Sequence, residues 1–559
     1  VILLLGRGAK FKCLMSEAPM ETEYIRSEGC AKRMGARLMA IVAEGPRGRV
    51  YLSPIEEHVA ASKVSSPSWR PDVPIPNDPR NFWTPNYGLN TYGELFTDRQ
   101  LVALNTFSDL VQEARAKVLT EAKNGWNDDG VSLSQGGKGP TAYADALSVY
   151  LTFAVDKTAN YCSTINTYAS SGGFIVQTFG RQAIPMKWDF AESNPIGDST
   201  GCWNSMVDWV YDALLNVPAS GHGCVQQNDA QTQTISSGKL VSTDPPYYDN
   251  IGYADLSDYF YVWMRKGLRG LYPELFSTMT VPKAEELVAT PYRHGGKEQA
   301  EAFFMDGMTA TMHNLCQLSH TAFPVSIYYA FKQSETDNAG TSNAGWESFL
   351  EAVIRAGFVI TGTWPMNTER PQGLKTGSNV LASSIILVCR PRGESAAEIS
   401  KREFLKELKE QMPEALRAMQ GLDGLATPVA PVDMAQAAIG PGMEIYSKYK
   451  AVLNADGTRM SVHDAIIEIN RYLDKGDDFD PETQFCRDWF LEHAWGEGPS
   501  GEADVLARAK GLSVNDVVSA DILLSHGGKT GLMHWQDYPE DYDPLKDTHR
   551  PVWEVCHHL

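Results

Sequence analysis

The sequence predicts an α/β fold built on a mostly parallel sheet whose last strand is reversed, with helical and mixed α+β accessory regions. Two observations support this class. From residue 238 onward, short apolar strands alternate with amphipathic helices, and this alternation is typical of a parallel sheet. Residues 358–364 and 382–390 then form two strands with no helix between them, which predicts that they pair antiparallel.

The composition indicates a folded protein of several domains. At 559 residues the chain exceeds a single compact core, and its apolar share of 43% is typical of globular proteins. No apolar run reaches the roughly 20 residues that span a bilayer, so no membrane association is expected. Nine cysteines without disulfide-like spacing predict reduced thiols in a cytoplasmic protein. Two pairs of residues could suggest a metal site, Cys13 with Cys30 and His222 with Cys224. Their spacing does not match that of known metal ligands, so no metal site is predicted.

The net charge limits how the chain can bind nucleic acid. The formal net charge of −20 argues against nonspecific coating of DNA, because phosphate contacts need Lys and Arg. A local basic surface on an acidic body stays compatible with DNA binding. The basic clusters at 265–269 and 390–402 could supply one, although a solvated face is the simpler interpretation of each.

The first half of the chain is predicted to contain two regions. Residues 1–80 are the remnant of an N-terminal or insert region, with strands at 37–43 and 47–52 and a Pro- and Ser-rich linker. Residues 81–235 form a helical region. Its first helix begins at Thr97, which can form a capping box with Gln100. Two more helices follow at 142–159 and 205–215, and the second is predicted to turn Trp209 and Leu214 inward.

The second half is predicted to hold the sheet and an accessory domain. Within residues 236–395, strands are expected at 239–243, 323–331, 358–364 and 382–390, and helices at 255–267, 301–319 and 345–356. Residues 396–559 form a mostly helical accessory domain. Its expected elements are a charged helix at 401–419, further helices at 462–473, 481–493 and 503–509, and a small β element at 523–535.

The run Asp244-Pro-Pro-Tyr247 ends the first of these strands, where α/β sheets place their ligands. An amine attached to a nucleobase is a poor nucleophile because its lone pair is delocalised. The Asp244 carboxylate and the carbonyl between the two prolines can each accept one amine hydrogen, which makes the nitrogen more tetrahedral. Pro245 and Pro246 stiffen the loop, so these acceptors are preorganised. Tyr247 offers a ring face for stacking a base, worth about 1–3 kcal/mol. A rigid turn is the alternative, but the strand before it and the helix after it favour a functional loop.

Residues 243–263 resemble the DUF1156 family of predicted adenine-specific DNA methylases. The likeness covers nearly the whole chain and includes further short motifs, at 96–100, 188–195, 364–369, 381–384, 440–443 and 480–483. It implies a Rossmann-like methyltransferase sheet and transfer of a methyl group from S-adenosylmethionine to an exocyclic base amine, with N6 of adenine ahead of cytosine. The substrate implied is duplex DNA with the target base flipped out. The setting implied is restriction–modification or anti-phage defence, with other defence-system subunits as partners.

The predicted site residues centre on this loop. Asp244, Pro245, Pro246 and Tyr247 are expected to be catalytic, and Thr243 and Asp244 are expected to touch the cofactor. Six residues are expected to line the base or the substrate, with a scaffolding role left open for the last three: Tyr248, Asn250, Tyr253, Glu192, Asn194 and Glu369.

One family feature is missing. The glycine-rich strand-turn that cradles the cofactor, roughly Asp-Pro-Phe-x-Gly-Gly-Gly, is not found upstream of the loop. Together with the start at Val1, this leads us to expect an N-terminally truncated or split enzyme that by itself binds S-adenosylmethionine weakly or not at all. Two alternatives stay open. In the first alternative, the methyl group is transferred to another amine, as in protein-glutamine or RNA methylases, which typically have Asn where Asp244 stands. In the second, the chain is a catalytically silent scaffold or DNA-recognition subunit of a defence complex.

Overall fold

The structure is a computed structural model of the chain, and it describes residues 2–4, 10–64, 66–217, 221, 223–248, 251–329, 344–367, 383–419, 431–474, 479–538 and 550–558. The chain divides into two compact units. Unit 1 comprises Val1–Val225 and Ile251–Glu286, and unit 2 comprises Gln226–Asn250 and Leu287–Leu559. The four predicted regions stay a prediction. No helix within the described ranges has both the length and the apolar character that crossing a membrane requires.

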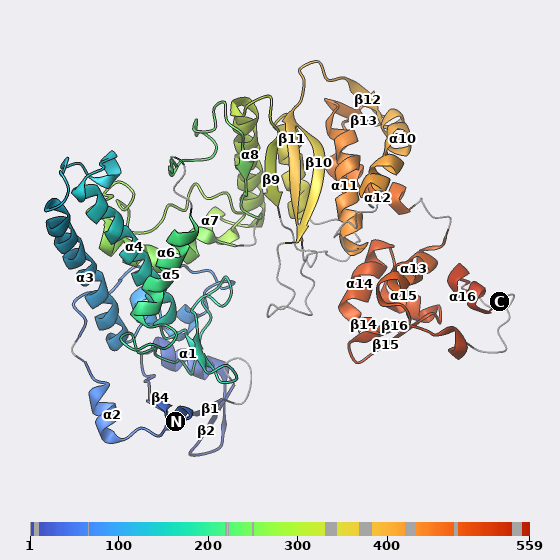
Figure 1. Cartoon of the computed structure of the whole chain (residues 1–559). Coiled ribbons are helices and arrows are strands. Elements are labelled where there is room, and N and C mark those ends of the chain that lie inside the picture. Colours follow the sequence, from blue (N-terminus) through green and yellow to red (C-terminus); the bar gives the residue numbers. More distant parts are fainter. Residues whose placement is uncertain are drawn as a thin grey trace. The chain divides into compact units, whose positions relative to one another are not determined.

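Unit 1 is mainly helical (Figure 1). Its helices are α1 (Thr22–Cys30), α2 (Glu56–Ala61), α3 (Asp98–Lys123), α4 (Pro140–Tyr161), α5 (Trp203–Asn216) and α6 (Tyr253–Leu268), with short 3-10 turns at Thr84–Tyr87, Tyr92–Leu95 and Leu133–Gln135. Its strands form a small antiparallel sheet and two hairpins. The sheet contains β1 (Ile2–Leu4), β2 (Phe11–Cys13) and β3 (Pro19–Met20), and the hairpins pair β4 (Ile41–Gly45) with β5 (Gly48–Leu52) and β6 (Thr167–Ala169) with β7 (Phe174–Val176).

Helix α3 begins where the sequence predicts. The Thr97 hydroxyl accepts the Gln100 N–H at 3.3 Å, and the Gln100 side chain accepts the Thr97 N–H at 2.8 Å. This reciprocal capping box satisfies donors that the first turn leaves without helical partners. Leu101 is fully buried and shares a core cluster with Tyr259 and Trp263 of α6. Capping therefore sets the start of α3, and its apolar face sets how it packs.

Unit 2 contains the longer strands. Its helices are α7 (Pro291–His294), α8 (Lys297–Leu318), α9 (Ala344–Arg355), α10 (Lys401–Met419), α11 (Pro431–Ser447), α12 (Val462–Asp474), α13 (Pro481–His493), α14 (Ser500–Ala509), α15 (Val514–Ser519) and α16 (Val552–His558). A mixed sheet contains β8 (Ser242–Thr243), β9 (Val325–Tyr329), β10 (Phe358–Asn367) and β11 (Ser383–Pro391). Two smaller sheets contain β12 (Glu398–Ser400) with β13 (Ala451–Leu453), and β14 (Gly498–Pro499), β15 (Leu523–His526) and β16 (Lys529–Leu532), with a 3-10 turn at Trp535–Asp537.

The mixed sheet has the order β10–β11–β9–β8. Strands β8 and β9 are parallel, with Ser242 opposite Ser326 and Thr243 opposite Ile327. Strand β11 is antiparallel to both of its neighbours, so β8, β9 and β10 all run in one direction. The prediction that residues 358–364 and 382–390 pair antiparallel is confirmed.

The last of these strands in the chain, β11, is reversed as expected. The sequence predicts this strand at the end of the sheet, and that position is wrong, because β11 lies between β9 and β10. Strand β11 buries Ile385, Leu387 and Cys389, and β10 beside it buries Phe358 and Ile360 and forms the edge of the sheet. Apolar runs of this kind do not predict which of two neighbouring strands lies inside the sheet. The chain is thus a mixed α/β protein, and its largest sheet in the described residues has four strands of mixed direction, so those residues form no Rossmann-like parallel sheet.

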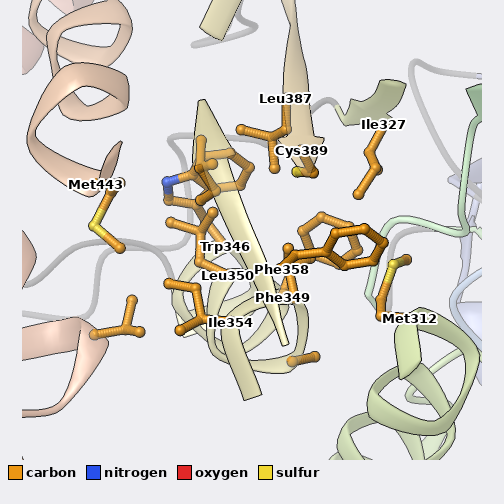
Figure 2. Packing of buried hydrophobic residues seen from close by; sticks show 14 of the residues in the cluster. Met312, Ile327, Trp346, Phe349, Leu350, Ile354, Phe358, Leu387, Cys389 and Met443 are labelled. Carbon is orange, nitrogen blue, oxygen red and sulfur yellow. The ribbon is translucent and has the colours of Figure 1, made fainter. Parts of the chain in front are cut away.

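Helices pack around this sheet, with α8 on one side and α11 and α12 on the other (Figure 1). Figure 2 shows the side chains of α9 in the middle of the core, between Met443 of α11 and Met312 of α8. Phe349 and Leu350 of α9 and Phe358 of β10 are fully buried. Burying each such side chain is worth about 1.5–3 kcal/mol. This core holds β8 and β9 in register, and so it also holds the loop that follows β8.

Candidate functional site

The predicted loop begins at the end of β8. Thr243 is the last residue of β8 and pairs with Ile327 of β9, so Asp244 follows directly at the carboxyl end of a parallel pair of strands. Asp244 is exposed, whereas Pro245 is buried. The backbone of the loop is therefore anchored in unit 2 while its carboxylate faces solvent. A carboxylate closed into the core could not have reached a substrate.

Tyr247 holds the Asp244 carboxylate in place. Its hydroxyl donates a hydrogen bond to Asp244 Oδ1 at 2.9 Å. Its ring meets the Tyr329 ring edge-on, with 5.4 Å between centroids. Tyr329 is only 2% exposed and stacks on Phe349 of α9 at 4.2 Å. The orientation of the carboxylate is thus set by packing that reaches into the core.

Two hydrogen-bond acceptors of the loop have no donor among the described residues. These are Asp244 Oδ2 and the Pro245 carbonyl, which is the carbonyl between the two prolines. The next carbonyl, that of Pro246, accepts the Tyr248 N–H at 3.1 Å. Asp244 Oδ2 and the Pro245 carbonyl are therefore the two acceptors that the loop can offer to an NH2 group. The other carboxylate oxygen, Oδ1, already accepts a hydrogen bond from Tyr247.

Tyr248 belongs to the packing of the loop. Its φ of 44° lies in the left-handed region, which is uncommon for a residue with a side chain. Its carbonyl accepts the Ala289 N–H at 2.9 Å, and its ring meets Phe304 of α8 edge-on at 5.1 Å. A Cβ at Gly345, near the start of α9, would lie 3.1 Å from the Tyr248 Cβ. The loop is thus supported by α8 and α9 together.

The sequence did not single out Tyr329, Phe304 and Gly345, although each supports the loop. A signal for Tyr329 was present, because the carboxyl ends of neighbouring parallel strands meet at the same edge of a sheet. The strand predicted at 323–331 places Tyr329 at that end. Phe304 and Gly345 carry no comparable signal, since their contacts depend on how α8 and α9 pack.

Glu192, Asn194 and Tyr253 lie in unit 1, and the Asp244 loop lies in unit 2. Glu192 accepts two hydrogen bonds from Arg99, at 2.7 and 2.9 Å, and one from the Thr97 hydroxyl at 3.1 Å. Asn194 is exposed and its side chain accepts the Ile196 N–H at 3.2 Å. Tyr253 begins α6 and is 43% exposed. These contacts give Glu192 and Asn194 local structural roles. The predicted residues Asn250 and Glu369 lie outside the described residues.

An ionisable pair lies near the start of α9. His463 Nδ1 is 2.8 Å from Glu347 Oε1, two residues beyond Gly345. Burial raises the pKa of the Glu347 carboxyl, and the hydrogen bond and charge of His463 act in the opposite direction. The pair joins α9 to α12, so it contributes to the frame around the loop.

The fold and the loop define a mixed α/β protein with an exposed carboxylate at the carboxyl end of a parallel strand pair. Residues 480–559 match the family described as Domain of unknown function (DUF8807). No curated protein and no solved structure matches the chain. The predicted membership of the DUF1156 family is wrong, because the match found is to DUF8807 and no methyltransferase family matches.

The motifs behind that resemblance include ordinary folding signals. Thr97 caps α3, and Asp480 caps α13 by accepting the Thr483 N–H at 2.8 Å. Gly440 lies within α11, where the absence of a side chain lets the helix approach Thr363 of β10. Helix caps and close helix–strand contacts occur in unrelated proteins because they satisfy general requirements of the backbone. Matches of this kind therefore carry little information about family.

Proposed function

We propose that the loop of residues 244–247 holds an exocyclic amine for methylation, and that the chain acts in an S-adenosylmethionine-dependent DNA methyltransferase. The preferred acceptor is N6 of adenine in a base flipped out of the duplex. One observation carries the proposal. Asp244 is exposed at the carboxyl end of β8, Tyr247 orients one carboxylate oxygen, and Oδ2 and the Pro245 carbonyl accept no hydrogen bond from described residues.

The chemistry follows from these acceptors. An NH2 group has two hydrogens, and a carboxylate oxygen and a carbonyl can each accept one. Accepting both draws the nitrogen lone pair out of conjugation, toward the direction from which a methyl group arrives. Hydrogen bonds to a charged group are worth about 1.5–3 kcal/mol. Positioning of well-oriented partners supplies up to roughly 7–11 kcal/mol. The half-buried Tyr247 ring offers a stacking face for the base.

We further propose that the mixed sheet is part of a Rossmann-like methyltransferase sheet. Three features support this. Strands β8, β9 and β10 run in the same direction, and α9 connects β9 to β10. The added strand β11 is reversed. The loop lies at the carboxyl end of the parallel pair, where such sheets bind ligands.

The described residues around Asp244 do not by themselves fit S-adenosylmethionine. A cofactor of this kind needs a glycine-rich turn for close backbone approach, and none follows the described strands β8 and β9. Only Thr243 and Asp244 are assigned to the cofactor. The proposal therefore gives this chain the task of holding the amine, and no step is derived through the bound cofactor. The expected role in DNA defence depended on the DUF1156 resemblance, which is wrong, so it is not proposed.

The test is methyl transfer by the full chain. Unmethylated duplex DNA and S-adenosylmethionine with a labelled methyl group are incubated with wild type, Asp244→Ala and Asp306→Ala. Asp306 is an exposed residue of α8 with no assigned role, so it provides the matched control. Because this chain is expected to bind S-adenosylmethionine weakly, the cofactor is supplied at a concentration high enough to offset weak binding. Under that condition the proposal predicts transfer to DNA by wild type and by Asp306→Ala, and a loss of at least about a hundredfold in Asp244→Ala. Equal transfer by all three chains would contradict the assigned role of Asp244.

A catalytically silent or split subunit is the second candidate, and the missing glycine-rich turn favours it. It predicts no methyl transfer by the chain alone, with retained DNA binding in a gel-shift assay. Calorimetry with S-adenosylmethionine separates the two candidates further. Tight binding by this chain alone favours the complete enzyme. Absence of methyl transfer, DNA binding and cofactor binding together would exclude both candidates.

A further inference from the structure

A histidine and two glutamates meet where α13 ends and α14 begins, within the region 480–559. The potential ligand atoms of Glu492, His493 and Glu502 all lie within 4.8 Å of one another. We propose that these three side chains bind one divalent transition-metal cation, with Zn²⁺ as the best match. This site is independent of the Asp244 loop. The sequence predicts no metal site because its sparse Cys and His pairs lack metal-ligand spacing.

The imidazole of His493 is held in a fixed position. His493 is the last residue of α13, and its ring packs on the Trp489 ring at 4.3 Å. Gly498 packs against both rings. A Cβ at Gly498 would lie 2.8 Å from His493 Nε2 and 2.9 Å from the Trp489 ring, so a larger residue there would force these rings to move. The His493 side chain is 18% exposed. A ligand that is already immobilised loses little conformational entropy when a cation binds.

The geometry between His493 and Glu502 favours a shared cation over a direct hydrogen bond. His493 Nε2 lies 3.1 Å from Glu502 Oε2, which is within hydrogen-bonding range. Nevertheless Nε2 is buried and forms no hydrogen bond with the described residues. The two side chains are therefore within ion-pair distance while the buried Nε2 is left without a hydrogen bond in the described part of the chain. Two ligands of one tetrahedral cation have a similar separation, because two bonds of about 2.0–2.2 Å at the tetrahedral angle place N and O about 3.4 Å apart, a few tenths of an ångström more than the 3.1 Å found here.

The ligand types narrow the choice of cation. Mg²⁺ and Ca²⁺ prefer sites made of oxygen atoms alone, whereas an imidazole nitrogen suits Zn²⁺ and its neighbours in the transition series. Glu492 and Glu502 are both exposed, so a cation reaches them from solvent. The charge of a dication balances the two negative charges of these carboxylates. Three protein ligands leave one position of a tetrahedral site for water.

The test is Zn²⁺ binding to the full chain by isothermal titration calorimetry, with Zn²⁺ itself as the probe. The variants are His493→Gln and Glu502→Gln, which keep the size of each side chain approximately. The control is His526→Gln, because His526 is a 71% exposed histidine that lies 3.5 Å from Glu497, outside the cluster. We expect a binding event in wild type and His526→Gln that is weakened at least about tenfold in both test variants.

Thermal unfolding gives a second measurement that does not depend on heat of binding. A cation that binds only the folded state raises the Tm. We expect Zn²⁺ to raise the Tm of wild type and His526→Gln and to leave that of Glu502→Gln unchanged. Circular dichroism without metal checks that each variant folds. The proposal is overturned if wild type shows no saturable binding, or if His493→Gln and Glu502→Gln bind Zn²⁺ as tightly as wild type. Either result would leave His493 and Glu502 as an ion pair at the C-terminus of α13.

Discussion

The Tyr247 hydroxyl donates a hydrogen bond to Asp244 Oδ1 at 2.9 Å, so one residue of the loop orients the carboxylate of another. The Tyr247 ring rests against Tyr329, which is buried at the carboxyl end of the neighbouring strand β9. The geometry of the proposed amine-holding group is therefore determined by the sheet core and not by the loop alone. Tyr247 consequently has two roles in the proposal: it offers a stacking face and it positions Asp244.

Tyr247→Phe separates these two roles. The ring and its contact with Tyr329 are kept, and only the donor to Asp244 is removed. We expect methyl transfer to fall by roughly tenfold, equivalent to about 1.4 kcal/mol in the barrier. Because this hydrogen bond is exposed, the free energy of unfolding should change by less than about 1 kcal/mol. Initial rates on unmethylated duplex DNA and urea unfolding measure the two effects. Tyr211→Phe, at a 58% exposed tyrosine of α5, is the control, and an unchanged rate in Tyr247→Phe would refute the positioning role.

The sequence predicts many elements well because their signals are local. The charged helix expected at 401–419 is α10 with the same bounds, and the helix expected from Thr97 begins there. The small β element expected at 523–535 contains the antiparallel strands β15 and β16. Asp244 also follows a strand, as expected. In each case, apolar periodicity, capping or turn chemistry acts within a few residues.

Features that depend on the packing of distant segments could not be predicted. The pattern of α5 predicts which residues share a face, but it does not say whether another element covers that face. Trp209 and Leu214, predicted to face inward, are 45% and 39% exposed. Lys157 of α4 lies over the Trp209 ring at 4.1 Å and stabilises its exposed position. The order of strands in the sheet and the meeting of His493 with Glu502 have the same origin, because both arise only after helices and strands assemble.

Gly440→Ala tests the contact between α11 and β10. A Cβ at 440 would lie 1.8 Å from Thr363 Oγ1 and 2.6 Å from Thr363 Cβ, so the helix and strand would have to separate. Overpacking of this kind costs about 1–3 kcal/mol and occasionally more. We expect a loss of at least that size in urea unfolding. Gly393→Ala is the control, because no atom lies within 4 Å of its added Cβ, and it should change stability by less than about 0.5 kcal/mol. Equal stability of the two variants would contradict the close approach.

Glu192→Gln tests whether this predicted substrate-lining residue has a structural role. Glutamine keeps the shape but loses the charge that pairs with Arg99. The pair is partly exposed and bidentate, so we expect a cost of about 0.5–1.5 kcal/mol in unfolding and no change in methyl transfer. The control is Glu121→Gln, whose partner Lys117 lies 4.0 Å away on an exposed helix face, and it should be close to neutral. A large loss of methyl transfer with normal stability would instead place Glu192 in the substrate site.

Asp156 of α4 predicts a pH dependence of stability. Its side chain is 9% exposed, its Oδ1 accepts no hydrogen bond from described residues, and burial raises the pKa of the carboxyl well above its ordinary value of 3.8. The folded chain therefore keeps a proton that the unfolded chain releases. The contribution of Asp156 to the free energy of unfolding is fully present below pH 3.8, the ordinary pKa of the carboxyl. This contribution is lost as the pH rises through the raised pKa of the folded chain.

Asp156→Asn removes this titration while keeping the size of the side chain. We expect the free energy of unfolding of the variant, relative to wild type, to rise as the pH is raised from 5 to 8. In wild type alone, folding at the higher pH requires either an ionised buried carboxyl or uptake of a proton from solution. Urea unfolding at both pH values measures the two differences in the free energy of unfolding. Asp306→Asn, at an exposed aspartate of α8, should show the same difference from wild type at both values. A difference for Asp156→Asn that stays constant, or that turns against asparagine at pH 8, would show that Asp156 is ionised in the folded chain and is stabilised by a charge or donor.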